Sequence, residues 1–255
     1  ADMKGSVSLQ VLDSRQLIAC HGNASAEVKD TVFTFHDRQK TIFSGNDSVA
    51  NGKFHVSFVV PYDLSYGGSG QVLAFAKSDD LATIAHGCTD AIVLGDGDIQ
   101  KTDTVGPKIF CYLNSPEFVN GDDVNTSPYF VAQLSDDSGI NATGNGVGHN
   151  LELVVDGDAN KTYDLNDNFA YDFASHTAGT TSYTLPTLEP GTHTLRFRAW
   201  DTMNNSSTAM LSFNVVKSIK PRIYSVDVTK NPASTSTTLI VSHSLAGCPV
   251  DVTID

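Results

Sequence analysis

Positive charge and long hydrophobic runs are both scarce in this 255-residue chain. It has 16 lysine and arginine residues against 29 aspartate and glutamate residues, a formal net charge of −13. Phosphate recognition needs concentrated lysine and arginine, so this balance argues against a nucleic-acid partner and against an anionic membrane surface. No apolar run approaches the roughly 20 residues of a membrane helix. We expect an acidic protein with no direct membrane span.

Cysteine is also rare, at four residues: Cys20, Cys88, Cys111 and Cys248. None belongs to a CxxC motif, which excludes zinc-ribbon and thioredoxin-like sites. A disulfide between Cys20 and Cys88 is one hypothesis, because both fall in the first predicted domain. Free thiols buried on strands are the alternative.

No established catalytic motif is present. The chain lacks Gly-x-Ser-x-Gly, His-Glu-x-x-His and a P-loop. Cys20-His21-Gly22 and His86-Gly87-Cys88 contain the parts of a cysteine peptidase, but adjacent residues of a strand point to opposite faces. Only cross-pairs, Cys20 with His86 or Cys88 with His21, would remain open. We assign no catalytic residue to this chain.

Helical periodicity is nearly absent, whereas period-two alternation recurs. Phe54–Phe58 and Leu195–Ala199 alternate apolar with polar side chains, the pattern of half-buried antiparallel strands. Asn51-Gly52 and Asp156-Gly157 are dipeptides suited to tight hairpin turns. Residues 81–88 trace a single helical face and would equally suit an irregular edge. The sequence therefore predicts an all-β fold.

Glycine- and proline-containing polar breaks predict three domains, at 1–104, 105–217 and 218–255. The first two have the length of β-sandwiches. In the second, residues 188–193 form a Leu-x-Pro-Gly-x-x corner ahead of two long strands, which resembles immunoglobulin and fibronectin-III domains. Those families usually carry tyrosine where this chain has His193. The third segment holds three predicted strands, Arg222–Val228, Thr237–Ser242 and Val250–Ile254, and we expect an incomplete domain with an edge open to self-association.

Calcium is the one cofactor that the carboxylates suggest. One candidate set follows EF-hand-like spacing but lacks the central glycine and the final glutamate, and a hairpin turn explains its start equally well. A second set could meet at the junction of the first two domains, with solvated loops as the alternative. The first set is Asp156, Asp158, Asn160 and Asp167, and the second is Asp103, Asp136, Asp137 and Asp201.

Three stretches together resemble a known family. They are Asn51–Pro61, Ser135–His149 and Gly191–Ser207, and the resemblance runs in order along essentially the whole chain. It is to the region that follows the catalytic domain in PorU-type sortases, gingipain-family cysteine peptidases of the type IX secretion system. Residues 231–243 resemble the opening of the C-terminal sorting domain of that system.

The resemblance implies a non-catalytic accessory and export region whose peptidase domain lies upstream and is absent here. It implies tandem immunoglobulin-like sandwiches, export across the bacterial outer membrane to the cell surface, and partners among the outer-membrane β-barrel and translocon proteins of the system. The residues implied in sorting-signal recognition are Asn231, Pro232, Ser234, Thr235 and Thr237. The alternative function is a free-standing adhesin-like or carbohydrate-binding module.

Overall fold

The computed structural model describes residues 3–20, 32–61, 64, 68–93, 103–144, 148–218, 223–229, 232 and 236–243. Apart from two three-residue 3₁₀ turns, the regular elements within these ranges are all β-strands. The all-β prediction is confirmed. No helix in these ranges is long and apolar enough to cross a membrane.

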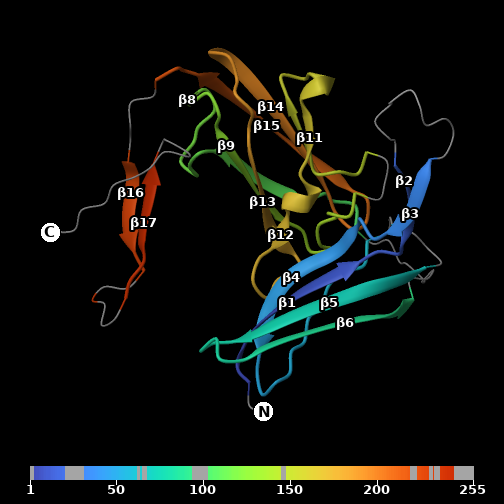
Figure 1. The fold of residues 1–255 in the computed structure, drawn as a ribbon. Coiled ribbons are helices and arrows are strands. Elements are labelled where there is room, and N and C mark those ends of the chain that lie inside the picture. The colour runs from blue at the N-terminus through green and yellow to red at the C-terminus, as the bar shows by residue number, and fades with distance from the viewer. Residues whose placement is uncertain are drawn as a thin grey trace.

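Residues 108–215 form a two-sheet sandwich with immunoglobulin-like strand order (Figure 1). One sheet runs β12-β13-β9-β7 and the other β11-β10-β14-β15-β8. Every pairing is antiparallel except that of β8 with β15. The strands are β7 (Lys108–Leu113), β8 (Asp123–Val124), β9 (Tyr129–Ser135), β10 (Glu152–Val155), β11 (Thr162–Asp164), β12 (Ala170–Tyr171), β13 (Ala178–Thr184), β14 (Gly191–Trp200) and β15 (Ser206–Val215), with 3₁₀ turns η1 (Ala159–Lys161) and η2 (Asn166–Asn168).

The sandwich core comes from inward-facing residues of both sheets, as the period-two pattern of β14 predicts. Leu195, Phe197 and Ala199 are fully buried, and Phe197 meets Phe130 of the opposite sheet with ring centroids 5.3 Å apart. The Asp156-Gly157 turn has positive φ at both residues, 56° and 66°, as its dipeptide predicts.

The first segment contributes one four-stranded antiparallel sheet, in the order β4-β1-β5-β6, and a separate two-stranded hairpin, β2–β3. A second sheet facing the first is not formed by the described residues 3–93, so an independent sandwich over 1–104 stays a prediction. The strands are β1 (Gly5–Leu12), β2 (Gln16–Cys20), β3 (Phe33–Asp37), β4 (Thr41–Val49), β5 (Ser69–Ser78) and β6 (Ile84–Val93).

Two stretches of the sequence adopt a structure that differs from the simplest interpretation of their pattern. Phe54–Phe58 is not a strand: it makes no ladder in the described chain, although Val56 and Phe58 pack on the core as their alternation suggests. Residues 81–88 are not helical. Leu81 has φ +58° in a turn, and Ile84 begins β6 at the sheet edge.

Phe43 of β4 joins this first sheet to the sandwich. It is 3% exposed, and its ring stacks on Phe58 at 4.9 Å and on Tyr171 of β12 at 5.1 Å. A Cβ added at Gly45 would lie 2.4 Å from the Phe43 ring, so glycine at this position is what admits the aromatic side chain. The inner face of the first sheet is therefore part of the same hydrophobic core as the sandwich.

Strands β16 (Ile223–Val228) and β17 (Leu239–His243) pair as an antiparallel hairpin beside one end of the sandwich (Figure 1). The two predicted strands of this region are confirmed to within a few residues. The third, Val250–Ile254, lies outside the described residues.

Replacing Phe43 with alanine should destabilise the protein by about 3–5 kcal/mol, because a large ring is removed from a contact that the surroundings cannot refill. Urea unfolding of Phe43→Ala measures this loss. Phe75→Ala is the matched control from the same sheet, since Phe75 is 46% exposed, and it should cost far less. Equal losses for the two variants would contradict the joined core.

Candidate functional site

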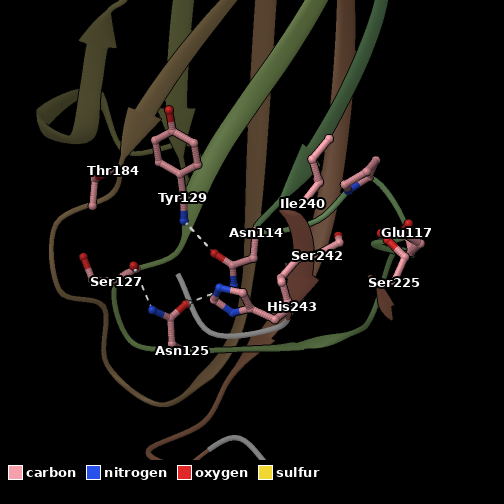
Figure 2. A pocket seen from close by; sticks show the side chains of 12 residues that line it. Asn114, Glu117, Asn125, Ser127, Tyr129, Thr184, Ser225, Ile240, Ser242 and His243 are labelled. Atoms are coloured by element: carbon pink, nitrogen blue, oxygen red, sulfur yellow. Dashed lines mark hydrogen bonds between the residues drawn. The ribbon is translucent and has the colours of Figure 1, made fainter. Parts of the chain in front are cut away.

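A large hollow among the described residues lies between the sandwich and the β16–β17 hairpin (Figure 2). Its volume is about 930 Å³. The sandwich contributes the connection after β7, the start of β9 and the end of β13, and the hairpin contributes Ser225 of β16 and residues 240–243 of β17. We call this hollow the hairpin groove. Its lining is Asn114, Pro116, Glu117, Asn125, Ser127, Tyr129, Thr184, Ser225, Ile240, Val241, Ser242 and His243.

Two asparagines organise the sandwich side of the hairpin groove. Asn114 Nδ2 donates to Asn125 Oδ1 at 3.1 Å, and the Tyr129 N–H donates to Asn114 Oδ1 at 2.8 Å. Asn125 Nδ2 in turn donates to the Ser127 carbonyl at 3.0 Å (Figure 2). Asn114 has φ +60°, a conformation that asparagine tolerates better than most residues. This network fixes the wall from which the Tyr129 ring projects.

The hairpin turns its more polar face toward the groove. Ser225 lies opposite Ser242, and Asp227 lies opposite Ile240. The Ser242 hydroxyl is 3.3 Å from that of Ser115, which gives one polar contact between hairpin and sandwich. Ser115 also donates to Glu117, and this hydrogen bond lowers the pKa of the Glu117 carboxyl.

The other face of the hairpin carries apolar cross-strand pairs, although Val241 at one end of it also lines the groove. Its cross-strand pairs are Val226 with Val241 and Val228 with Leu239. Val226 and Val228 are exposed, while their partners are half-buried. We call this surface the outer hairpin face. An exposed row of valines on a two-stranded sheet is unusual in a soluble domain and is typical of a contact surface.

The predicted sorting residues lie in the connection between β16 and β17. Pro232 and Thr237 are both exposed. Asn231, Ser234 and Thr235 lie outside the described residues. Neither Pro232 nor Thr237 lines the hairpin groove. The residues that do line it were not predicted from the sequence. Its wall comes from residues 114–129, whose only local signal is two asparagines near turns.

The first predicted calcium set does not converge. Asp158 caps η1, with Oδ1 accepting from the N–H and the side-chain amide of Asn160 at 2.9 and 3.1 Å. Asp167 is exposed in η2. Asp156 is engaged by His193 instead. The EF-hand-like spacing fails because the segment is a β-hairpin turn rather than a loop between helices.

His193 occupies the corner position where related folds carry tyrosine. Its Nδ1 is 2.8 Å from Asp156 Oδ2, and its Nε2 is 2.8 Å from the Glu189 carbonyl oxygen. Both partners are acceptors, so both ring nitrogens must carry protons for both bonds to form. The backbone bond to Glu189 reproduces the tyrosine corner with a different side chain, and the ring also stacks on Phe213.

Asp156 is held in its charged form. Burial alone would raise its pKa, but hydrogen bonds from the Thr194 N–H and from His193, with the charges of His193 and Lys161, lower it overall. The Thr194 bond is 2.9 Å. This carboxylate therefore links the 156–157 turn to the start of β14.

Three carboxylates of the second predicted calcium set do meet. Oxygens of Asp103, Asp136 and Asp201 all lie within 4.8 Å of one another, whereas Asp137 is not part of the group. Asp103 and Asp136 of the group line a hollow of about 330 Å³, and Asp201 is buried behind them. Such oxygens are the ligands that calcium prefers.

Protein donors already engage this acidic cluster. Asp201 is fully buried and accepts from the N–H groups of Met203 and Asn205, at 2.9 and 2.7 Å. Ser138 donates from its N–H to Asp136 and from its hydroxyl to Asp103, at 2.8 and 2.6 Å. Burial, followed by repulsion from the neighbouring carboxylates, raises the pKa of Asp136 to about 6, although the Ser138 N–H opposes the shift.

The three cysteines that the structure describes are free. Cys20 in β2 and Cys88 in β6 are free, exposed thiols in different sheets, so the hypothesised disulfide between them is not formed. Cys20 makes no hydrogen bond with His86, and His21 lies outside the described residues. Cys111 of β7 is half-buried, as expected for a thiol on a strand, and burial raises its pKa to about 11.

Asp156→Asn should destabilise the fold by about 1 kcal/mol near pH 7, because it removes the charge that faces His193 while keeping a residue that tolerates positive φ. A lowered pKa means that the carboxylate stabilises the fold above its usual value of 3.8, and that this contribution is lost as pH falls through the lower, folded value. The difference in free energy of unfolding between variant and wild type, measured with urea, should therefore become smaller in acid. Asp158→Asn is the control from the same turn, and an equal loss with no acid dependence would contradict the pairing.

Asp136→Asn should stabilise the protein by about 1 kcal/mol at pH 7 in metal-free buffer, a value reduced for solvent screening. Because the pKa of Asp136 is raised in the folded state, its protonation stabilises the fold fully below the usual pKa of 3.8. This stabilisation is lost as the pH rises through the folded value of about 6. The variant should therefore be as stable as wild type at pH 4 and more stable than wild type at pH 7. Thermal melts with and without calcium, alongside the exposed control Asp137→Asn, test this. A variant less stable than wild type without metal would contradict a repulsive cluster, and calcium protection of wild type alone would identify a cation site.

No protein-family model matches the chain, and no curated protein matches it. Among solved structures, the chain is similar to the crystal structure of dimeric latent PorU from Porphyromonas gingivalis. The two are 33% identical over 95% of this chain, with a TM-score of 0.47. The chain spans 23% of the length of that PorU chain. The similarity in sequence is thus to a part of PorU, and the fold assignment rests on the strand order given above.

Proposed function

We propose that this chain is a non-catalytic accessory and targeting region of a type IX secretion sortase. An immunoglobulin-like sandwich would present the first hairpin of a sorting domain for recognition at the bacterial cell surface. The observation that carries this proposal is the β16–β17 hairpin, which lines the groove with Ser225 and Ser242 and leaves Val226 and Val228 exposed. The sequence resemblance of residues 231–243 to such domains supports it.

The physics of the hairpin favours a contact role. Two strands alone bury too little apolar surface to be stable in water, so the hairpin depends on what covers it. Both strands have one unpaired edge in the described chain, and an unpaired edge offers main-chain donors and acceptors to an added strand. Strand addition would supply affinity from the backbone and specificity from alternate side chains, which here are the valines of the outer hairpin face.

Catalysis is assigned to another part of such a protein. A cysteine peptidase needs a thiol within hydrogen-bond reach of an imidazole. Among the described residues, the exposed thiols of Cys20 and Cys88 have no hydrogen-bonded histidine. We infer that the cleavage of sorting signals, the activity expected of PorU-type sortases, belongs to a peptidase domain outside this chain.

The alternative of a carbohydrate-binding module has less support from the structure. Sugar sites often present an open aromatic face. The single tryptophan, Trp200, is half-buried, with the His149 ring 4.1 Å from its own and the Arg198 guanidinium 5.5 Å from its centroid. Its indole is therefore not an open platform. Tyr129 in the hairpin groove is 38% exposed, and a sugar could reach its ring there.

Removal of the chain from Asn231 onward should abolish surface display in a bacterium that has a type IX system. The protein would be expressed from its full gene, and display would be measured by protease accessibility on whole cells. Val226→Asp with Val228→Asp should reduce display strongly, because the two charges disrupt the outer hairpin face. Asp227→Asn is the control from the other face of β16 and should leave display unchanged. Wild-type display of the truncated protein would overturn the targeting role.

A further inference from the structure

The hairpin groove runs along an open edge of strand β17. Four consecutive residues of β17, 240–243, line the groove, whereas β16 contributes only Ser225. Consecutive residues of a strand point to alternate faces, so four in a row share the edge of the strand rather than one face. In the described chain β17 pairs with β16 alone, which leaves its other edge without a partner. The main-chain donors and acceptors of that edge therefore face the groove.

The opposite wall of the groove offers side-chain amides rather than another strand edge. Asn114 and Asn125 belong to the connections after β7 and β8 (Figure 2). Each side-chain amide has two N–H donors. One is used within the wall, from Asn114 to Asn125 and from Asn125 to the Ser127 carbonyl. An extended peptide in the groove would pair with β17 on one side and accept from these amides on the other.

The groove has room for a main chain with its side chains. Its volume of about 930 Å³ is at the upper end of the range for ligand sites. Strand β17 is five residues long, so a segment of that length would span it. The Tyr129 ring and Ile240, which is 50% exposed, are the apolar surface that alternate side chains of such a segment would cover.

The charge of the groove selects the kind of segment that fits. Among the described residues that line it, none is lysine or arginine, and the one carboxylate is Glu117, which is exposed. The Ser115 hydroxyl donates to this carboxyl and lowers its pKa, so Glu117 is charged at neutral pH. The whole chain has a net charge of −13. An anionic ligand would be repelled, whereas a lysine or arginine would be attracted to Glu117.

We propose that the hairpin groove binds an extended, basic segment of another protein, which adds to the open edge of β17 as a strand. Main-chain hydrogen bonds would supply most of the affinity, and a lysine or arginine beside Glu117 would set the register. This inference rests on the proposed function, since it names the kind of partner segment that the hairpin receives. The surface is distinct from the outer hairpin face.

Selection from a phage-displayed library of random seven-residue peptides, with the complete chain as bait, tests the proposal. The enriched peptides should be rich in lysine and arginine and poor in proline, which lacks the main-chain N–H. A fluorescent copy of the most enriched peptide is then titrated with the chain by anisotropy. A selection that enriches nothing, or that enriches acidic peptides, would overturn the proposal.

Glu117→Gln should weaken binding of this peptide by about three- to fivefold, the effect expected for an exposed ion pair. Asp164→Asn is the matched control, because it removes an exposed carboxylate on β11 that does not line the groove. It should leave the affinity unchanged. Equal weakening by the two variants would show general attraction to an acidic protein and would contradict a defined site.

Main-chain pairing is tested from the side of the peptide. Along a strand, the N–H groups of one edge belong to alternate residues, and only one edge of the added strand would meet β17. The peptide is therefore N-methylated at its odd positions in one version and at its even positions in the other. One version should bind more than tenfold more weakly than the unmodified peptide, and the other should bind within about threefold of it. Equal effects of the two versions would contradict strand addition.

A benzophenone side chain at the centre of the peptide locates the site. Irradiation should crosslink it to residues 240–243 or to the wall at Tyr129, as read by mass spectrometry. Crosslinks on β6 or on the outer hairpin face would overturn the assignment to the groove. So would dimers of the chain that the peptide dissociates, since a second copy would then be the occupant. These measurements read binding in solution, so they fail or succeed independently of surface display, which tests the targeting role.

Discussion

The stacking of Phe43 on Tyr171 is the contact on which the arrangement of the N-terminal sheet depends. A four-stranded sheet with one apolar face cannot stand in water unless that face is covered. Here the sandwich covers it, and the two rings lie 5.1 Å apart at the centre of the junction. Tyr171 is itself fixed, because its hydroxyl both donates to the Ile140 carbonyl and accepts from the Ile140 N–H, each at 2.9 Å.

That tyrosine also connects the junction to the acidic cluster. Ile140 follows Asp136 and Ser138 in the same loop. The two hydrogen bonds of Tyr171 to Ile140 therefore hold the loop that carries Asp136 of the cluster and its donor Ser138. Burial raises the pKa of Tyr171 to about 12, and the Asp136 charge contributes in the same direction. The hydroxyl therefore stays protonated and keeps donating to the Ile140 carbonyl. Aromatic packing and a polar clamp thus act through one side chain.

Much of the fold could be predicted because its signals are local. Alternation in β14 and the Asn51-Gly52 and Asp156-Gly157 turns depend on neighbours in the sequence, and the structure confirms them. Phe54–Phe58 shows the limit of that reasoning. Its alternation correctly indicates which side chains pack on the core. A strand also needs a hydrogen-bonded neighbouring strand, and the described chain supplies none for this segment.

The sites depended on pairs distant in sequence. The EF-hand-like spacing over 156–167 failed because spacing alone does not say that Asp156 faces His193, 37 residues later. The meeting of Asp103, Asp136 and Asp201 was foreseen only as one alternative, because it requires a domain junction to bring three loops together. The hairpin groove was missed, since its two walls are about 100 residues apart in the chain and neither wall has a motif of its own.

A contrast between covered and uncovered sheets runs through the molecule. In the sandwich, both inner faces are buried, and a histidine replaces the corner tyrosine without loss of the backbone bond. At β6 and at the β16–β17 hairpin, the backbone is regular but one edge or face has no cover in the described chain. Since regular strands with unsatisfied edges are costly to keep exposed, these two places are where contacts with other chains would add most to stability. The acidic charge of the chain opposes random association, so such contacts would need a defined register.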